Sequence, residues 1–186
     1  TAADSVGGGV MLNSITGRVE VVDCSFLHNT SSANVGGMAI GTSSGTVAVS
    51  GCSFISNAVN NLGGSEYYGD GGGLMVYSEG ASHAVISSNL FIGNSASGGS
   101  NPDGGGLMTY QSGIACSLLL EDNEFSGNTA GLGGGGCILR FNQSGDLTSR
   151  RNLFAGNRAL IGAGGGALVY IDLGSVDYTA NRHNGN

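Results

Sequence analysis

The chain has no lysine and no tryptophan, only one proline, and few charged residues of either sign, which make up 10% of its 186 positions. All six basic residues are arginines, and only Arg150 and Arg151 stand next to each other. Together with a formal net charge of -7, this scarcity argues against nucleic acid or an anionic membrane as a partner. The longest apolar runs, such as GIACSLLL, are far too short to cross a bilayer, so we expect no membrane span.

Glycine, in contrast, is abundant, with 37 residues. The glycines follow no Gly-X-Y period, which excludes collagen, and regularly spaced apolar runs argue against a disordered low-complexity chain. Because 40% of the residues are hydrophobic, the chain can bury a core, and we treat residues 1–186 as a single domain. The glycines must therefore serve turns.

Two short motifs alternate through the chain. The first is F-x-x-N, found at Phe26/Asn29, Phe54/Asn57, Phe91/Asn94, Phe125/Asn128 and Phe154/Asn157, with a tyrosine variant at Tyr178/Asn181. The second is a glycine pair followed by three mostly apolar residues: GGVML, GGMAI, GGLMV, GGLMT, GGCIL and GGALV. Successive aromatic positions are 28, 37, 34, 29 and 24 residues apart, so a fixed unit carries connections of variable length, as in a solenoid.

The stretches between the motifs indicate β-structure. VEVVDCSF and VAVSGCSF alternate apolar and polar residues as short strands do, and no segment has the period of a helix. The sequence therefore predicts an all-β fold, a right-handed parallel β-helix of about six coils, or rungs, with three short strands per rung. Equivalent residues of neighbouring rungs would then lie about 4.8 Å apart.

Stacking of rungs explains the repeated residues. The phenylalanines would form an aromatic ladder in the core, and each asparagine of F-x-x-N would bond to the asparagines above and below it at a bend. The residues two positions before the aromatic ring form another predicted column: Cys24, Cys52, Asn89, Asn123, Asn152 and Val176. The glycine pairs would have positive φ or allow close approach of the backbone at a corner.

The alternation of Gly-Gly-apolar and F-x-x-N resembles the repeat of chlamydial polymorphic outer-membrane proteins, and of similar pectin-lyase-like β-helix segments in large surface proteins of bacteria and algae. The resemblance extends from Gly7 to Asn181. It implies passenger-like display at the cell surface and a role in adhesion or assembly, and it brings no catalytic residues with it.

Four cysteines are an even number for a surface protein, which makes disulfides plausible. Cys24 and Cys52 hold the same position in adjacent rungs, so stacking would place their Cα atoms within disulfide range. The alternative is that both are small buried thiols packed as hydrophobes. A Cys116–Cys137 pair follows only by elimination.

Two Asn-x-Ser/Thr sequons begin at Asn29 and Asn142. Asn29 is also a ladder residue, which would bury it, whereas Asn142 precedes SGD, which is typical of a loop tip. We therefore expect an attached glycan at Asn142 rather than at Asn29, provided that the chain passes through a eukaryotic secretory pathway.

Parallel β-helices can host polysaccharide lyases and hydrolases, which need clustered carboxylates and, in a lyase, a basic residue. Only Glu121, Asp122 and Glu124 cluster in this sequence, so we expect no enzyme and no cofactor. Asp70 and Asp103 directly precede glycine runs in adjacent rungs and are candidates for a metal-ion site. The alternative is that each is a turn residue that bonds its own backbone.

The strand after each glycine pair is apolar on both faces. We place Val10, Met38, Leu74, Leu107 and their equivalents inside, which leaves the alternate residues outside. The outer set is Met75, Met108, Ile138 and Leu168 beside Tyr77, Tyr110 and Tyr170. We expect this set to contact other protein subunits, by self-assembly or on a surface partner; the alternative is cover by the chain's own long loops.

The N-terminal sequence TAADSVGGG lacks the features of a secretory signal, which we take as removal of a targeting segment or as a sign of a longer parent chain. With no capping helix expected at either end, the rod would continue in a longer chain or stack on copies of itself. We therefore predict a secreted or cell-surface, non-enzymatic, structural or adhesive unit of an extracellular filament or cell-surface assembly. The alternative is a carbohydrate-binding or polysaccharide-degrading β-helix that uses Tyr67, Tyr68, Tyr77 or Tyr110.

Overall fold

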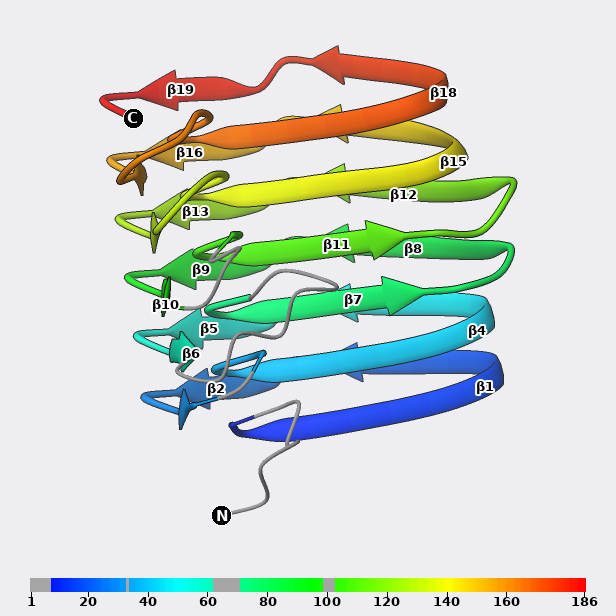
Figure 1. The fold of residues 1–186 in the computed structure, drawn as a ribbon, viewed down its shortest axis with the longest axis horizontal. Helices are drawn as coiled ribbons and strands as arrows, with labels where there is room; N and C mark the ends of the chain where they lie inside the picture. Colours follow the sequence, from blue (N-terminus) through cyan, green and yellow to red (C-terminus); the bar gives the residue numbers. More distant parts are fainter. Residues whose placement is uncertain (1–7, 33, 62–70, 99–102) are drawn as a thin grey trace.

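The computed structural model describes residues 8–32, 34–61, 71–98 and 103–186. These residues form strands, and no helix occurs among them. The chain coils upward from the N-terminus, with the near strands running to the right and the far strands to the left (Figure 1), so the coil is right-handed. The predicted all-β parallel β-helix with three sheets per turn is confirmed, and it has about five turns where the sequence predicts about six rungs.

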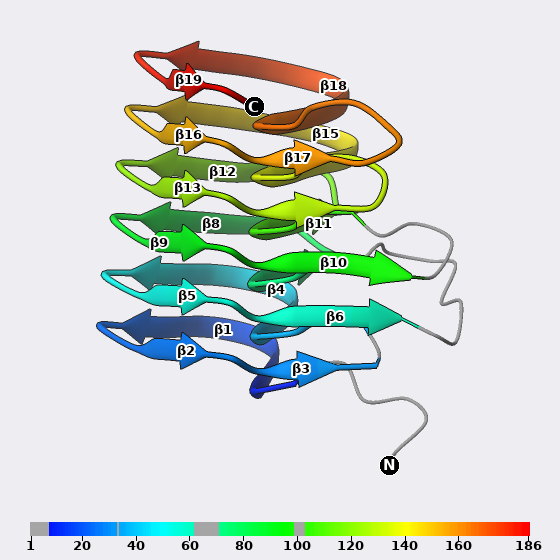
Figure 2. The same ribbon diagram turned by 90° about the vertical axis from the view of Figure 1, so that its left-hand side faces the viewer.

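All strand pairs in the three sheets are parallel (Figure 2). Sheet A contains β1 (Val10–Val22), β4 (Met38–Ser50), β7 (Leu74–Ser78), β8 (Ser82–Ser87), β11 (Leu107–Gln111), β12 (Cys116–Glu121), β15 (Cys137–Arg150) and β18 (Ala167–Thr179). Sheet B contains β2 (Ser25–Leu27), β5 (Ser53–Ile55), β9 (Leu90–Ile92), β13 (Glu124–Ser126), β16 (Leu153–Ala155) and β19 (Arg182–Asn184). Sheet C contains β3 (Thr30–Ser31), β6 (Ala58–Asn61), β10 (Ser95–Gly98), β14 (Thr129–Ala130) and β17 (Arg158–Ala159).

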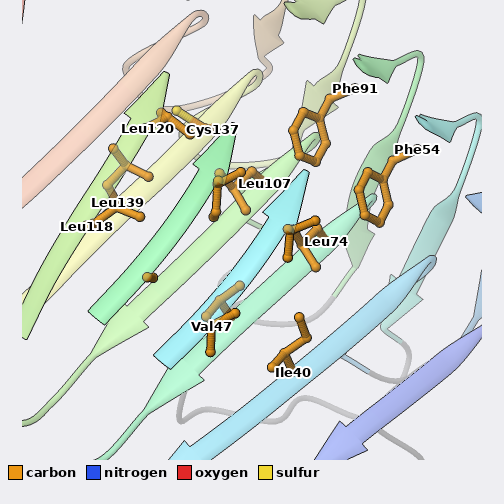
Figure 3. Close-up of a cluster of buried hydrophobic side chains, with 14 of the residues drawn as sticks. Ile40, Val47, Phe54, Leu74, Phe91, Leu107, Leu118, Leu120, Cys137 and Leu139 are labelled. Atoms are coloured by element: carbon orange, nitrogen blue, oxygen red, sulfur yellow. The ribbon is translucent and has the colours of Figure 1, made fainter. Parts of the chain in front are cut away.

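The core fills the interior of the coil along its whole length. Met38, Leu74, Leu107 and Cys137 are paired in register on successive strands of sheet A, and all four are buried. Figure 3 shows Leu74 and Leu107 in the same cluster as Phe54 and Phe91, which come from sheet B. The alternate set placed inside from the sequence therefore does face the core.

The two sharp corners of each rung are single residues in the left-handed region, with φ between 52° and 64°. The corner from sheet A to sheet B is formed by Asp23, Gly51, Ser88, Asp122, Arg151 and Ala180, and that from sheet B to sheet C by His28, Ser56, Gly93, Gly127, Gly156 and Gly185. In the sequence, each corner residue directly precedes an asparagine or cysteine of a ladder. The left-handed residue turns the chain, and the next side chain bonds along the rod axis.

The glycine pairs serve close approach rather than positive φ. A Cβ built on Gly106, the second glycine of its pair, would lie 2.5 Å from the carbonyl oxygen of Gly136 in the next rung. It would also lie 3.2 Å from the amide carbon of Asn128, the ladder asparagine of its own rung. Only glycine lets the chain pass this close to both neighbours, so the two sequence motifs depend on each other.

The sixth copy of F-x-x-N was predicted at the wrong place. His183, not Tyr178, pairs with Phe154, and Asn186 continues the asparagine column after Asn157. Tyr178 lies within β18, where it pairs with Ser149 of sheet A. The reason is the length of β18: it runs to Thr179, as far along the sheet as β15, and this moves sheet B of the last rung further along the chain.

Candidate functional site

A column of aromatic rings runs through the interior. Phe26, Phe54, Phe91, Phe125 and Phe154 stack with ring centroids 4.6–4.9 Å apart and with interplanar angles of 3–6°. His183 extends the column, with its ring 4.7 Å from that of Phe154. The spacing is that of paired strands, so the register of the sheets fixes each ring over the next.

A ladder of asparagines lies at the corner between sheets B and C. Asn94 is representative: its Oδ1 accepts hydrogen bonds from the backbone N–H and from the Nδ2 of Asn57. Its Nδ2 donates to the carbonyl oxygen of Phe54 at 2.8 Å and to Oδ1 of Asn128 at 2.9 Å. The same pattern links Asn29, Asn57, Asn94, Asn128, Asn157 and Asn186. Inside the rod, each amide is fully satisfied although it is buried.

A second ladder occupies the corner between sheets A and B, where it links Asn89, Asn123, Asn152 and Asn181 in the same way. Asn181 therefore belongs to this ladder and not to the first, and Val176, which pairs with Leu147, is not part of the column predicted for it. Towards the N-terminus the ladder changes to thiols. The backbone N–H of Cys52 donates to Oδ1 of Asn89, and that of Cys24 points to Sγ of Cys52 at 3.5 Å.

The four cysteines are free, so the predicted disulfides are corrected. The thiols of Cys24 and Cys52 point to the carbonyl oxygens of Val22 and Ser50, each at 3.2 Å, and not to each other.

Cys116 and Cys137 belong to different columns of sheet A and cannot pair. Cys116 is in register with Gly145, and Cys137 with Leu107 and Ala167. Cys137 is buried among apolar side chains, which raises the pKa of its thiol; burial also raises the pKa of the Cys52 thiol. Neither thiol is activated as a nucleophile.

The outer apolar residues of sheet A are largely covered by the chain itself. Met75, Met108 and Ile138 are at most 4% exposed, in a cluster with Val35 and Ala39. The glycine-rich segment that returns to sheet A folds over them: a Cβ on Gly104 would lie 2.8 Å from that of Met108 and 3.1 Å from Cγ2 of Ile138. The prediction that these three residues form an exposed interface is therefore wrong, because the glycines allow the chain to cover them.

Beyond these residues, an outer strip remains at the surface, consisting of Tyr77, Tyr110, Arg140 and Tyr170, which follow one another in register. The rings of Tyr77 and Tyr110 stack at 5.6 Å, and the guanidinium of Arg140 lies 5.3 Å from the ring centre of Tyr170. Tyr77 and Tyr110 are half-buried, as is the neighbouring Leu168, and Tyr170 is 51% exposed.

Hydrogen bonds hold two of the tyrosine hydroxyl groups of the outer strip in place. The hydroxyl of Tyr77 donates to Glu79, and that of Tyr110 accepts from Nδ2 of Asn142. The strip is therefore an ordered row of ring edges and hydrogen-bonding groups.

Asp103 connects its rung to the next one. Its carboxylate is buried, accepts a hydrogen bond from the backbone N–H of Gly133 at 3.0 Å and pairs with Arg140. Burial raises the pKa of this carboxyl. The charge of Arg140 and the hydrogen bond from Gly133 partly offset that rise. The structure therefore gives no support to Asp103 as a candidate metal ligand, because its oxygens are engaged by residues of the next rung. Asp70, the other candidate, lies outside the described residues.

The acidic cluster of the sequence is paired with the arginine pair of the next rung. Glu121 bonds Arg150 and Arg151, and Asp122 forms a two-point contact with Arg151 at 2.8 Å. The Arg151 guanidinium lowers the pKa of the exposed Asp122 carboxyl. In the described parts of the chain, no three His, Cys, Asp or Glu residues lie close enough together to bind a metal ion. Among the same residues, no helix long and apolar enough to cross a membrane is present.

The two sequons lie in unlike places. Asn29 is half-buried in the first ladder, where its Nδ2 donates to Asn57 at 2.9 Å. Asn142 is exposed on β15, next to the irregularity between Phe141 and Ser144. Its glycosylation stays a prediction.

Comparison of the chain with protein-family models, curated proteins and solved structures finds no match. Function must therefore be argued from the arrangement of the residues themselves.

Proposed function

We propose that this chain is a non-enzymatic structural unit of an extracellular filament or cell-surface assembly, which presents its outer strip to other protein subunits. The observation that carries the proposal is the set of three side-chain ladders, one of phenylalanines and two mainly of asparagines, that run along the rod. Each rung repeats the same contacts, so the ladders act as a scaffold that holds surface groups at fixed spacing.

The sequence motifs support the same role. The alternation of Gly-Gly-apolar and F-x-x-N resembles the repeat of polymorphic outer-membrane-type surface proteins, and on that likeness we place the chain outside the cell. The outer strip is rich in tyrosine and arginine, the residue types that contribute most often to protein–protein contacts.

Carbohydrate binding receives less support from the same residues. A sugar ring stacks on an open aromatic face, whereas Tyr77 and Tyr110 turn their faces toward each other at 5.6 Å. Tyr67 and Tyr68 lie outside the described residues. The arrangement therefore favours contacts through ring edges and hydroxyl groups.

Sedimentation velocity over a hundredfold range of protein concentration, with negative-stain electron microscopy of the same samples, tests this proposal. We expect assemblies that grow with concentration and become weaker in the combined variant Tyr77→Ser, Tyr110→Ser, Tyr170→Ser. The matched control is the combined variant Leu27→Ser, Leu90→Ser on sheet B. Leu27 is 49% exposed and Leu90 is 39% exposed. A chain that stays monomeric throughout, or equal weakening by both sets, contradicts the proposal.

A further inference from the structure

The long strand of sheet A is interrupted in two neighbouring rungs. β1, β4, β15 and β18 run without a break for 13 or 14 residues. In contrast, β7 ends at Ser78 and β8 begins at Ser82, and in the next rung β11 ends at Gln111 and β12 begins at Cys116. Both breaks lie at the same bend of the coil (Figure 1), since β7 pairs with β11 and β8 with β12.

Polar side chains turn into the core at this bend. Ser78, Ser82, Gln111 and Cys116 are at most 2% exposed. The hydroxyl of Ser78 contacts that of Ser82, which lies 3.0 Å from Oε1 of Gln111. The thiol of Cys116 points to the carbonyl oxygens of Gly80 and Gly113, both at 3.3 Å. The four side chains thus form a small polar cluster inside an apolar rod.

Two buried atoms beside this cluster have no hydrogen-bond partner among the described residues: Nε2 of Gln111 and Oγ1 of Thr109. Thr109 is fully buried, and it lies two positions before Gln111 on β11, so both side chains point inward from the same strand. A buried polar group without a partner destabilises the folded state, which makes two such groups on one strand unusual.

Reversing the side-chain amide of Gln111 does not remove the problem. With the amide turned, Nε2 would donate to Ser82 and Oε1 would become the unpaired atom, since the cluster offers this amide one neighbour only. Either orientation leaves one amide atom without a hydrogen-bond partner among the described residues.

The chemistry of the cluster specifies what that ligand is. The four side chains of the cluster and Thr109 are uncharged, so an ion held by them would be buried without a counter-charge. The ligand must be small and must both accept and donate hydrogen bonds, because a Gln amide and a Thr hydroxyl need a partner together. We propose that this bend is a binding site for a buried water molecule, held by Gln111 and Thr109.

The replacement of Thr109 by valine, which has the same shape, tests the proposal by the sign of its effect. If the hydroxyl binds water, Thr109→Val lowers the urea midpoint of unfolding. If the hydroxyl is unpaired, the same change raises the midpoint. Thr42→Val is the matched control, because Thr42 is buried on β4 and donates a hydrogen bond to the carbonyl oxygen of Ser44 at 2.8 Å. The change in the urea midpoint of this variant measures the effect of removing a hydrogen bond that is formed.

A double-mutant cycle with Gln111→Met shows whether the two groups share one ligand. We expect each single change to lower the midpoint and the double variant to lose less than the sum of the two. Strictly additive effects, or a midpoint raised by Thr109→Val, overturn the proposal. Independently of any variant, NMR of the wild-type protein should show a cross peak between the Gln111 side-chain amide protons and a long-lived water; its absence would also count against the site.

Discussion

Gly106 packs closely against Asn128, the ladder asparagine of its own rung, and against the backbone of the next rung, which together leave no space for a side chain. A Cβ on Gly106 would lie 3.2 Å from the amide carbon of Asn128 and 2.5 Å from the carbonyl oxygen of Gly136. Gly127, which directly precedes Asn128, differs in kind: its φ is 64°, but nothing lies within 4 Å of a Cβ built there. Gly106 is therefore required for close approach, and Gly127 for a left-handed backbone conformation. Substituting each in turn measures the two requirements separately.

We expect Gly106→Ala to lower the free energy of unfolding by about 2–4 kcal/mol, because the backbone of the next rung must move. Gly127→Ala should cost only about 1–2 kcal/mol, the strain of a left-handed residue that has a Cβ. Ala180 already holds such a conformation at the other corner, with φ of 54°. Urea unfolding of both variants measures the difference, and equal losses would show that close approach is not the constraint.

The ladders make a second prediction, at Asn94. In Asn94→Asp, two donor hydrogens are replaced by oxygen lone pairs that face the carbonyl oxygen of Phe54 and Oδ1 of Asn128. At pH 7 we expect a loss of about 3–5 kcal/mol, since a buried charge is left without a partner.

Because burial would raise the pKa of the new carboxyl above its unfolded value, stability should be retained below about pH 4 and lost as the pH rises through the folded-state pKa. Unfolding midpoints at pH 4 and pH 7 measure this. The control is Asn60→Asp on β6, which is exposed and should show little dependence on pH. The same pH dependence in both variants would contradict the role of the ladder.

The aromatic and asparagine columns could be predicted because a stacked position repeats its residue type. Phe26 to Phe154 and Asn29 to Asn157 recur with the strand alternation that surrounds them, and that pattern fixes both fold class and register. The last rung was misassigned because Tyr178-x-x-Asn181 has the form of the motif by chance. The two ladders combine into N-x-F-x-x-N, and Asn181, His183 and Asn186 fit this longer pattern.

The cover over Met75 and Met108 could not be predicted from periodicity. An alternating strand shows that two faces are apolar, but it does not show what lies over the outer one. The sequence predicts that the glycine pairs have positive φ or allow close approach of the backbone, but it does not show that Gly104, just before one pair, lies within contact distance of Met108. The pairing of Asp103 with Arg140 was missed for a similar reason: the residues lie in different rungs, and no local spacing connects them.

The cysteines give a third prediction. Only Cys24 is exposed, while Cys52, Cys116 and Cys137 are buried. Burial also raises the thiol pKa of Cys52 and Cys137, which disfavours the reactive thiolate. Protein assayed in the absence of reductant should therefore give one thiol that reacts rapidly with Ellman's reagent when folded and four in denaturant. A total of two in denaturant would reveal a disulfide and refute the free-thiol arrangement.

The Asp122–Arg151 pair gives a fourth prediction, for acid stability. The Arg151 guanidinium lowers the folded-state pKa of Asp122, so the pair contributes stability above the unfolded value of 3.8 and loses it as the pH falls through the lower folded value. The urea midpoint should therefore fall less between pH 7 and pH 3 in Asp122→Asn than in the wild-type protein. High salt should shrink this difference, since both groups are at the surface. If the midpoint falls equally in both proteins at low salt, the contact between the two side chains does not link the rungs in solution.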